Sequence, residues 1–127
     1  MAKKKPKQGT LTRRADRYFS LYIRQRDGQC QAGRSWNQGC EGIHNLQCAH
    51  GLSRRYYSTR WDPRNAWALC RACHTYFTHH PIEWDMWLED RLGLELYREI
   101  RLLALTKYEG DKEATAALYR SLVEEAA

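Results

Sequence analysis

Two short clusters of cysteine, histidine and asparagine hold the residue types that could do chemistry in this chain. Residues 48–50 (CAH) form the first, and residues 70–74 (CRACH) form the second, with Asn65 between them. Thiolates bind soft metal ions such as Zn²⁺, and a histidine can bind a metal or take up a proton near neutral pH. The clusters therefore predict a metal site close to a histidine that transfers protons.

The cysteines favour metal binding over disulfide bonds. There are five of them, an odd number, and the sequence shows neither a secretory signal nor a transmembrane stretch, so we expect a cytoplasmic protein. Cys70 and Cys73 form a C-x-x-C knuckle that can share one Zn²⁺, which needs two further ligands. We expect Cys30 and Cys40 to complete this structural zinc site, with Cys48 as the alternative ligand.

The N-terminal part is predicted to be a basic arm followed by a helix. Residues 1–10 are rich in lysine and nearly free of apolar side chains, so we expect them to be disordered. Residues 11–26 carry apolar side chains at helical spacing, and Asp27-Gly28 is a typical helix end. The other face of this helix carries four arginines: Arg13, Arg14, Arg17 and Arg24.

The two clusters are predicted to lie on a strand–loop–strand–helix unit. Residues 45–50 alternate as a half-buried strand does, and residues 65–69 read as a second short strand. His74 then opens a segment long enough for one or two helical turns before Pro81. Such a unit brings both clusters onto one small sheet and the helix beside it.

The C-terminal part is predicted to be helical. An apolar stripe at helical spacing runs from Trp84 to Leu103, and Gly93 is expected to kink or split this helix. We expect Trp84 and Trp87 to belong to the core. Residues 113–125 predict a last helix, with three residues facing inward: Ala117, Leu118 and Leu122.

Charge is distributed unevenly along the chain. Residues 1–80 carry fifteen Lys and Arg against four Asp and Glu, a balance of +11, whereas residues 81–127 carry six against eleven, a balance of −5. A basic half of this kind is typical of proteins that bind the phosphate backbone of a nucleic acid. The acidic half is expected to face away from the polyanion.

The order of His50, Asn65 and His74, with a cysteine knuckle directly before the last histidine, resembles the HNH endonucleases. The similarity covers residues 28–80. It implies a ββα-metal fold in which a structural zinc and one catalytic divalent ion (Mg²⁺, Mn²⁺, Ni²⁺ or Zn²⁺) are bound. The expected class is therefore α+β: a zinc-stapled ββα-metal module with an N-terminal helix and a C-terminal helical extension over residues 81–127, in one domain of residues 11–127.

The segments at residues 59–63 (TRWDP) and 76–79 (YFTH) look like those of small phage HNH proteins, including NinG-like recombination nucleases. This resemblance implies a metal-dependent endonuclease that hydrolyses DNA phosphodiester bonds in phage or prophage DNA processing or recombination, inside a bacterial host cell. The products would carry a 5′-phosphate and a 3′-hydroxyl, and the substrate would be double-stranded or branched DNA.

The resemblance also implies roles for the site residues. His50 would be the general base, since its ordinary pKa of about 6.5 suits proton uptake at neutral pH. Asn65 would hold the loop and orient this base. His74, together with His79, would hold the catalytic ion beside the scissile phosphate.

The sequence departs from the family pattern at two places. Many HNH proteins have a metal-binding Asp or His directly before the base, where this chain has Ala49. The ion would then rest on His74 and His79, with water, phosphate or Asp62 completing its shell, and His80 is the alternative to His79. Nine residues, not two, separate Cys30 from Cys40, so this insertion is expected to bulge outward.

The loop between the predicted strands is rich in arginine and aromatic residues. Its four arginines are the expected DNA-binding residues: Arg54, Arg55, Arg60 and Arg64. Tyr56, Tyr57 and Trp61 could stack on splayed bases, while for Trp61 packing against the zinc module is an equal alternative.

Two other functions remain open from the sequence. Because Ala49 cannot bind a metal, the chain could be a catalytically inactive, zinc-stabilised DNA-binding module. The acidic C-terminal helices would also be compatible with a protein-interaction adaptor. The apolar stripe of those helices could also serve a homodimer.

Overall fold

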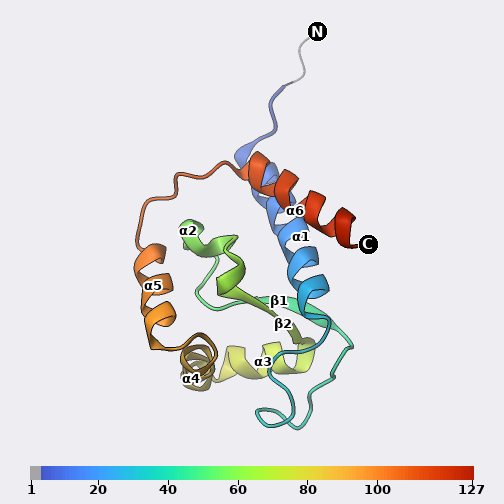
Figure 1. The fold of residues 1–127 in the computed structure, drawn as a ribbon, viewed down its shortest axis with the longest axis vertical. Coiled ribbons are helices and arrows are strands. Elements are labelled where there is room, and N and C mark those ends of the chain that lie inside the picture. Colours follow the sequence, from blue (N-terminus) through green and yellow to red (C-terminus); the bar gives the residue numbers. More distant parts are fainter. Residues whose placement is uncertain (1–3) are drawn as a thin grey trace.

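The structure is a computed structural model that describes residues 4–127. Within this range no helix combines the length and the apolar character needed to cross a membrane. Figure 1 shows two helical layers around a central strand pair. The elements in chain order are α1 (Gln8–Asp27), β1 (Leu46–His50), α2 (Tyr57–Arg60), the 3-10 turn η1 (Pro63–Asn65), β2 (Ala66–Cys70), α3 (Arg71–His79), α4 (Pro81–Leu92), α5 (Leu94–Ala104) and α6 (Lys112–Ala126).

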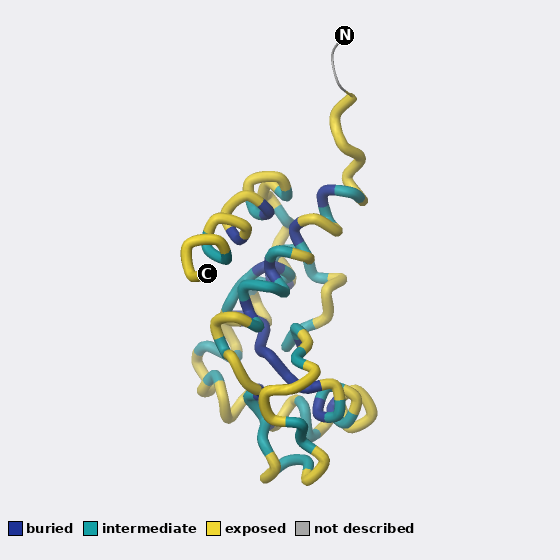
Figure 2. Tube along the Cα trace, turned by 90° about the vertical axis from the view of Figure 1, so that its right-hand side faces the viewer, coloured by how far each residue is buried: buried dark blue, intermediate teal, exposed yellow. Residues whose placement is uncertain are grey.

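The two strands form an antiparallel pair, with Leu46 opposite Cys70 and His50 opposite Ala66. Every residue of β2 is buried, and Figure 2 shows this strand as a continuous buried stretch inside the molecule. Both of its faces are covered, because α1 and α6 lie on one side of the pair and α3 and α4 on the other (Figure 1). The predicted α+β class, with a small sheet among helices, is confirmed.

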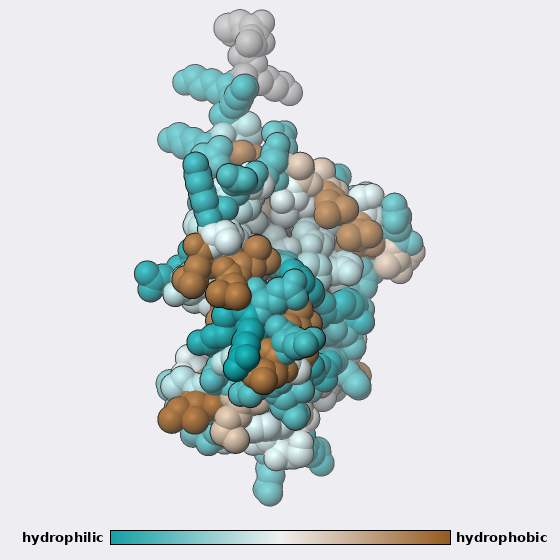
Figure 3. Space-filling view, turned by 60° about the vertical axis from the view of Figure 1, so that its left-hand side comes forward, coloured by the Kyte–Doolittle hydropathy of each residue, from teal (hydrophilic) through white to brown (hydrophobic). Residues whose placement is uncertain are grey.

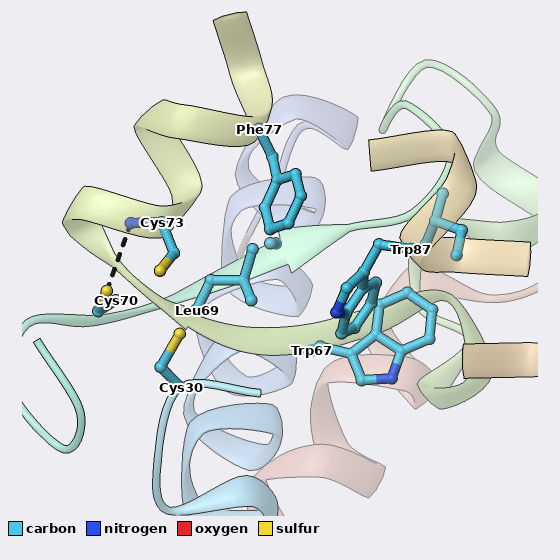
Figure 4. Close-up of a cluster of buried hydrophobic side chains, with 9 residues drawn as sticks. Cys30, Trp67, Leu69, Cys70, Cys73, Phe77 and Trp87 are labelled. Atoms are coloured by element: carbon cyan, nitrogen blue, oxygen red, sulfur yellow. Dashed lines mark hydrogen bonds between the residues drawn. The ribbon is translucent and has the colours of Figure 1, made fainter. Parts of the chain in front are cut away.

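Alternation along β2 divides the apolar core into two parts, since successive side chains of a strand point to opposite faces. Trp67 and Leu69 pack with Phe77 and Trp87 on the side of α3 and α4, as Figure 4 shows. Ala66 belongs to the other part, where α1 and α6 meet. The strand pair thus holds the two helical layers together.

Helix α1 buries the apolar face that its sequence predicts: Leu11, Ala15, Phe19 and Ile23. It ends as expected at Gly28, whose φ of 69° is the left-handed conformation that glycine favours. It begins at Gln8, so residues 8–10 of the predicted arm are helical. Residues 4–7 are exposed and form no helix or strand, and residues 1–3 lie outside the described range.

Helix α3 begins earlier than predicted, directly after β2. The Sγ atom of Cys70 accepts a hydrogen bond from the backbone N–H of Cys73 at 3.3 Å, which caps the first turn. The C-x-x-C therefore spans the strand end and the helix start. His74 consequently lies in the first helical turn and does not precede the helix.

Gly93 splits the long C-terminal helix into α4 and α5, one of the two outcomes that the sequence allowed. Its φ of 78° and ψ of 155° are incompatible with a continuous helix. Trp87 and Leu88 are buried, and the Trp84 ring stacks on Trp87 with centroids 5.0 Å apart, so the predicted core role of both tryptophans is confirmed. On α5, Ile100 is the buried residue of the predicted stripe.

The predicted inward face of α6 is confirmed at Leu122, which packs against the second core, and is wrong at Ala117 and Leu118. Ala116 and Tyr119 are buried, whereas Leu118 is 54% exposed and Ala117 is exposed. Tyr119 sets the rotation of this helix, because its ring packs edge-on against Phe19 at 5.0 Å and its hydroxyl donates to the Trp61 carbonyl at 2.8 Å. A large aromatic side chain with a buried hydrogen bond outweighs a leucine at this interface.

Several apolar side chains stay exposed on the C-terminal helices. Figure 3, which brings the side of α4 and α5 forward, shows them as separate patches among hydrophilic residues. A homodimer through these helices stays a prediction, and these side chains are where it would form: Ile82, Met86, Leu94, Leu102, Leu105 and Leu118.

Candidate functional site

Four cysteines from separate segments converge at one end of the strand pair. Their Sγ atoms all lie within 4.8 Å of one another, and Figure 4 shows Cys30, Cys70 and Cys73 side by side: the full set is Cys30, Cys40, Cys70 and Cys73. Four thiolates around Zn²⁺ at about 2.3 Å lie about 3.8 Å apart. The cluster therefore has the donor set and the size to hold a metal ion such as zinc.

The surroundings of the cluster suit thiolates. The backbone N–H of Glu41 donates to Cys70 Sγ at 3.3 Å, and Asn37 Nδ2 donates to Cys73 Sγ at 3.6 Å. Such donors stabilise negative sulfur. The segment between Cys30 and Cys40 leaves both sulfurs free to converge, but it does not simply bulge outward as predicted, because Ala32 and Trp36 pack against the core. The Cys30 N–H donates to the Gly42 carbonyl at 2.8 Å.

Cys48 is not part of this cluster, so the alternative zinc site is not formed. Its side chain packs on the other side of the sheet, beside Phe19 and Ala66 of the second core. Burial raises the pKa of its thiol to about 12. Cys48 is therefore a neutral, mostly apolar side chain.

His50 lies at the end of β1 with a fixed tautomer. Its Nε2 lies 2.8 Å from the backbone carbonyl oxygen of Arg60. A carbonyl only accepts hydrogen bonds, so Nε2 carries the proton and Nδ1 keeps a free lone pair. Burial, in part against the Phe19 ring at 5.7 Å, lowers the pKa of His50 to about 4. The ring is thus neutral at pH 7, with one nitrogen able to accept a proton.

His74 reaches the same place from α3. Its Nδ1 lies 2.7 Å from Gln47 Oε1, so this nitrogen carries the proton and Nε2 keeps a lone pair. Burial and the nearby Arg54 lower its pKa. Both histidines line one cavity of about 420 Å³, whose remaining lining residues are Asp16, Ser20, Gln47, Cys48 and Arg54. Residues 24 positions apart in sequence are thereby joined in one site.

The structure does not bring His79 to this cavity. His79 is exposed at the end of α3, and five helical residues turn it about 140° away from His74. His80 packs instead on the Tyr76 ring at 4.1 Å, and its Nδ1 lies 2.7 Å from the Tyr76 carbonyl. Asp62 is also elsewhere, because it pairs with an arginine and caps η1. Of the expected ligands, only His74 reaches the site.

Asn65 is buried behind His50 and ties the loop between the strands together. Its Oδ1 accepts from the Leu52 N–H at 2.8 Å, while its Nδ2 donates to the Leu52 and Thr59 carbonyls at 3.3 Å and 3.1 Å. A Cβ on Gly51 would lie 2.8 Å from Asn65 Oδ1, so the residue after His50 has to be glycine. Asn65 thus holds the loop, and it acts on His50 through the backbone, not by direct contact.

The four loop arginines divide into two pairs. Arg60 and Arg64 are neutralised within the molecule, Arg60 by Asp16 at 2.6 Å and Arg64 by Asp62 at 2.8 Å. The Arg54 side chain is 60% exposed at the cavity, and Arg55 is exposed. Arg54 is also within 3.8 Å of the Asp16 carboxylate, and Arg64 is 43% exposed, so of the four only Arg55 is exposed without a carboxylate partner among residues 4–127.

Trp61 is buried, and it packs between Tyr57 and Tyr108 rather than on the cysteine cluster. Its Nε1 donates to Asp16 Oδ1 at 3.0 Å. This ring is consequently not available to stack on a base.

Asp16 on α1 is a site residue that sequence reasoning missed. It accepts two hydrogen bonds from the Arg60 guanidinium, at 2.9 Å and 2.6 Å, and one from Trp61. Despite partial burial, these partners hold the pKa of its carboxyl below the ordinary value. Because the Arg60 carbonyl binds His50, α1 fixes the histidine through this clamp. The one available signal was that Asp16 is the single acidic residue among the five arginines of residues 11–26.

A scan against protein-family models finds no match, and searches of the curated proteins and of the solved structures find none either.

Proposed function

We propose that the chain is a metal-dependent endonuclease of the HNH type that hydrolyses DNA phosphodiester bonds, with phage or prophage DNA processing or recombination as its setting. The observation that carries this proposal is the shared cavity of His50 and His74. It combines a neutral imidazole of fixed tautomer with a second imidazole and an exposed arginine. A strand, an Asn-tied loop, a second strand and a helix position them, and the four-cysteine cluster binds a structural zinc.

His50 acts as general base in this proposal. Its Nδ1 takes the proton of the attacking water, while the Arg60 carbonyl holds Nε2–H and stabilises the imidazolium that forms. Arg54 neutralises the charge that grows on the phosphate oxygens. Positioned proton transfer of this kind contributes roughly 10²- to 10⁴-fold in rate.

The residues around the cavity fit a catalytic ion only if the substrate shares its binding. Among residues 4–127 the cysteines are the one group of three or more possible ligands that lie close together. His74 Nε2 is the protein ligand that the cavity offers, and phosphate and water would supply the rest. When bound, a divalent ion polarises the phosphate and stabilises the leaving oxygen. We therefore expect the histidine cavity to bind a divalent ion only weakly when no DNA is present.

Plasmid nicking by the zinc-loaded chain tests the proposal. Supercoiled DNA is incubated with Mg²⁺, Mn²⁺ or Ni²⁺ and with no added ion, a control that leaves the structural zinc in place. We expect ion-dependent nicking that His50→Ala and His74→Ala lose by about 100-fold or more. His79→Ala, a matched surface histidine, keeps full activity. Nicks that DNA ligase can seal show that the products carry 5′-phosphates. Unchanged nicking by His50→Ala refutes the role of His50 as general base.

The second candidate is the zinc-stabilised DNA-binding module without catalysis. One observation favours it: Ala49, which is 1% exposed, provides no ligand beside a small cavity of about 90 Å³ that His74 also lines. Binding of DNA with no cleavage under any ion would select this function. Nicking gained by Ala49→Asp would then identify Ala49 as the cause.

A further inference from the structure

Three arginines of α1 share one face of that helix. At about 100° per residue, Arg13, Arg17 and Arg24 point within about 40° of one another, and we call them the α1 arginine face. The opposite side of the helix is apolar and buried. Over the eleven positions from Arg13 to Arg24, a rise of about 1.5 Å per residue gives a row about 16 Å long.

This face lies directly beside the histidine cavity. Asp16 and Ser20, which line the cavity, lie next to the arginines on one flank of the helix. Helix α6 contacts nearly the opposite side of α1. The ring of Tyr22 lies 5.2 Å from the ring of Tyr119 on α6, and Tyr22 points about 160° away from the middle of the three arginines. The acidic C-terminal helix is therefore turned away from the face, and Arg54 continues its charge at the cavity.

The arginines of this face make no salt bridge within residues 4–127. Arg24 donates to the Ser20 carbonyl at 3.3 Å, and Arg13 to the Thr10 hydroxyl at 3.3 Å, so neither is neutralised. By contrast, Arg60 and Arg64 have carboxylate partners. Folding thus neutralises part of the charge in the loop that the sequence favoured, whereas the three arginines of the α1 arginine face keep theirs.

We propose that the α1 arginine face is the surface that binds the backbone of duplex DNA and leads it to the His50–His74 cavity. The inference rests on the proposed function and deepens it by naming the surface that holds the substrate. Duplex DNA carries one charge per about 1.7 Å of axis, so a row of this length runs beside several phosphates. Guanidinium groups bind phosphate oxygens in pairs of hydrogen bonds.

DNA-binding measurements test the inference separately from cleavage. Fluorescence anisotropy of a labelled DNA duplex is followed over a range of salt concentrations, in the His50→Gln background and without added divalent ion. The test variant carries Arg13→Gln, Arg17→Gln and Arg24→Gln. The control, Arg98→Gln, Arg101→Gln and Arg120→Gln, removes the same charge from α5 and α6. A lysine triple at the α1 positions keeps the charge and shows whether a loss comes from misfolding.

We expect the α1 glutamine variant to bind at least 10-fold more weakly, with a salt slope smaller by about 2 to 3, since each phosphate contact contributes about 0.9. The control stays within about threefold, and the lysine variant recovers most of the affinity. Equal loss in both glutamine variants, no DNA binding by the parent, or preference for an RNA duplex overturns the inference. If α1-dependent binding is seen but plasmid nicking is not, the proposed function fails and the inference stands.

Discussion

The two ends of the β1–β2 pair are built by different means. The cysteine end (Cys30, Cys40, Cys70 and Cys73) gathers four identical ligands around one point. The histidine end (His50, Asn65 and the loop of residues 51–64) has no such common centre. It is held by hydrogen bonds to backbone carbonyls, by a buried amide, and by a carboxylate from α1.

This difference separates the cluster that can hold the fold together from the end that would serve the proposed reaction. The cysteine end is closed by its own ligands, and binding of a metal there contributes directly to folding. The histidine end keeps a cavity and two imidazoles with free lone pairs, and it depends on elements outside the ββα unit. Substitutions at the cysteine end should therefore unfold the chain, whereas substitutions at the histidine end should change the orientation of His50.

Loss of one cluster thiolate should have the largest effect. If the cluster holds zinc, Cys73→Ser should abolish zinc binding and unfold the chain or lower its melting temperature strongly, because structural zinc sites contribute on the order of 10 kcal/mol in small domains. Zinc content per chain and thermal unfolding by circular dichroism measure both effects. Cys48→Ala, outside the cluster, should keep its zinc. Equal zinc loss in the two variants would contradict the four-cysteine site.

Removal of the buried amide should have the next largest effect. Asn65→Ala leaves the N–H and the carbonyl of Leu52 without partners and removes one of the two donors to the Thr59 carbonyl, so we expect a loss of about 3 kcal/mol in the free energy of unfolding. Asn65→Asp keeps the acceptor but places a buried carboxylate oxygen against the two carbonyls, so at neutral pH it should lose at least as much stability as Asn65→Ala. Urea unfolding measures the losses. A negligible change in Asn65→Ala would show that the loop does not depend on this residue.

Removal of the α1 clamp, the pair of Asp16 and Arg60, should cost less stability but should alter which ring nitrogen of His50 carries the proton. Asp16→Asn keeps the shape and loses the charge that holds Arg60, with an expected cost of about 2 kcal/mol. The surface pair of Asp85 and Arg101, both about half exposed, offers the control Asp85→Asn, which should cost less than about 1 kcal/mol. Imidazole ¹⁵N shifts should show that His50 no longer carries its proton only on Nε2. An unchanged tautomer would exclude positioning through Arg60.

Acid should also weaken the histidine end. His50 has a pKa of about 4 in the folded chain, below its ordinary 6.5, so the unfolded chain binds this proton more readily. Its stability contribution is complete above pH 6.5 and is lost as the pH falls towards 4. A pKa depression of this size corresponds to about 3 kcal/mol, so we expect the parent to lose up to that much more stability than His50→Gln over this window. Parallel urea-unfolding curves for both chains would contradict the assigned burial.

Much of this arrangement could be predicted from residues close together in the sequence. The C-x-x-C, the end of α1 at Gly28 and the split at Gly93 depend on local backbone chemistry and on ligand type. The alternation of β1 and β2 and the apolar face of α1 follow from periodicity, which any amphipathic element carries in its sequence. Cys30 and Cys40 were the expected partners of the knuckle, but the sequence left Cys48 open as the alternative, and only the structure excluded it.

The tertiary structure alone decided which polar residues are available. Arg60 and Asp16 lie 44 positions apart, and only folding shows that they cancel each other's charge while the α1 arginines stay unpaired. Likewise Tyr119 rotates α6 by a contact with Phe19 that no local pattern contains. The helical turn from His74 to His79 removes a ligand that spacing had suggested. The sequence determined the ligands and the elements, whereas the long-range packing of α1 determined the environment of His50, because burial and ion pairing depend on neighbours that the chain order does not specify.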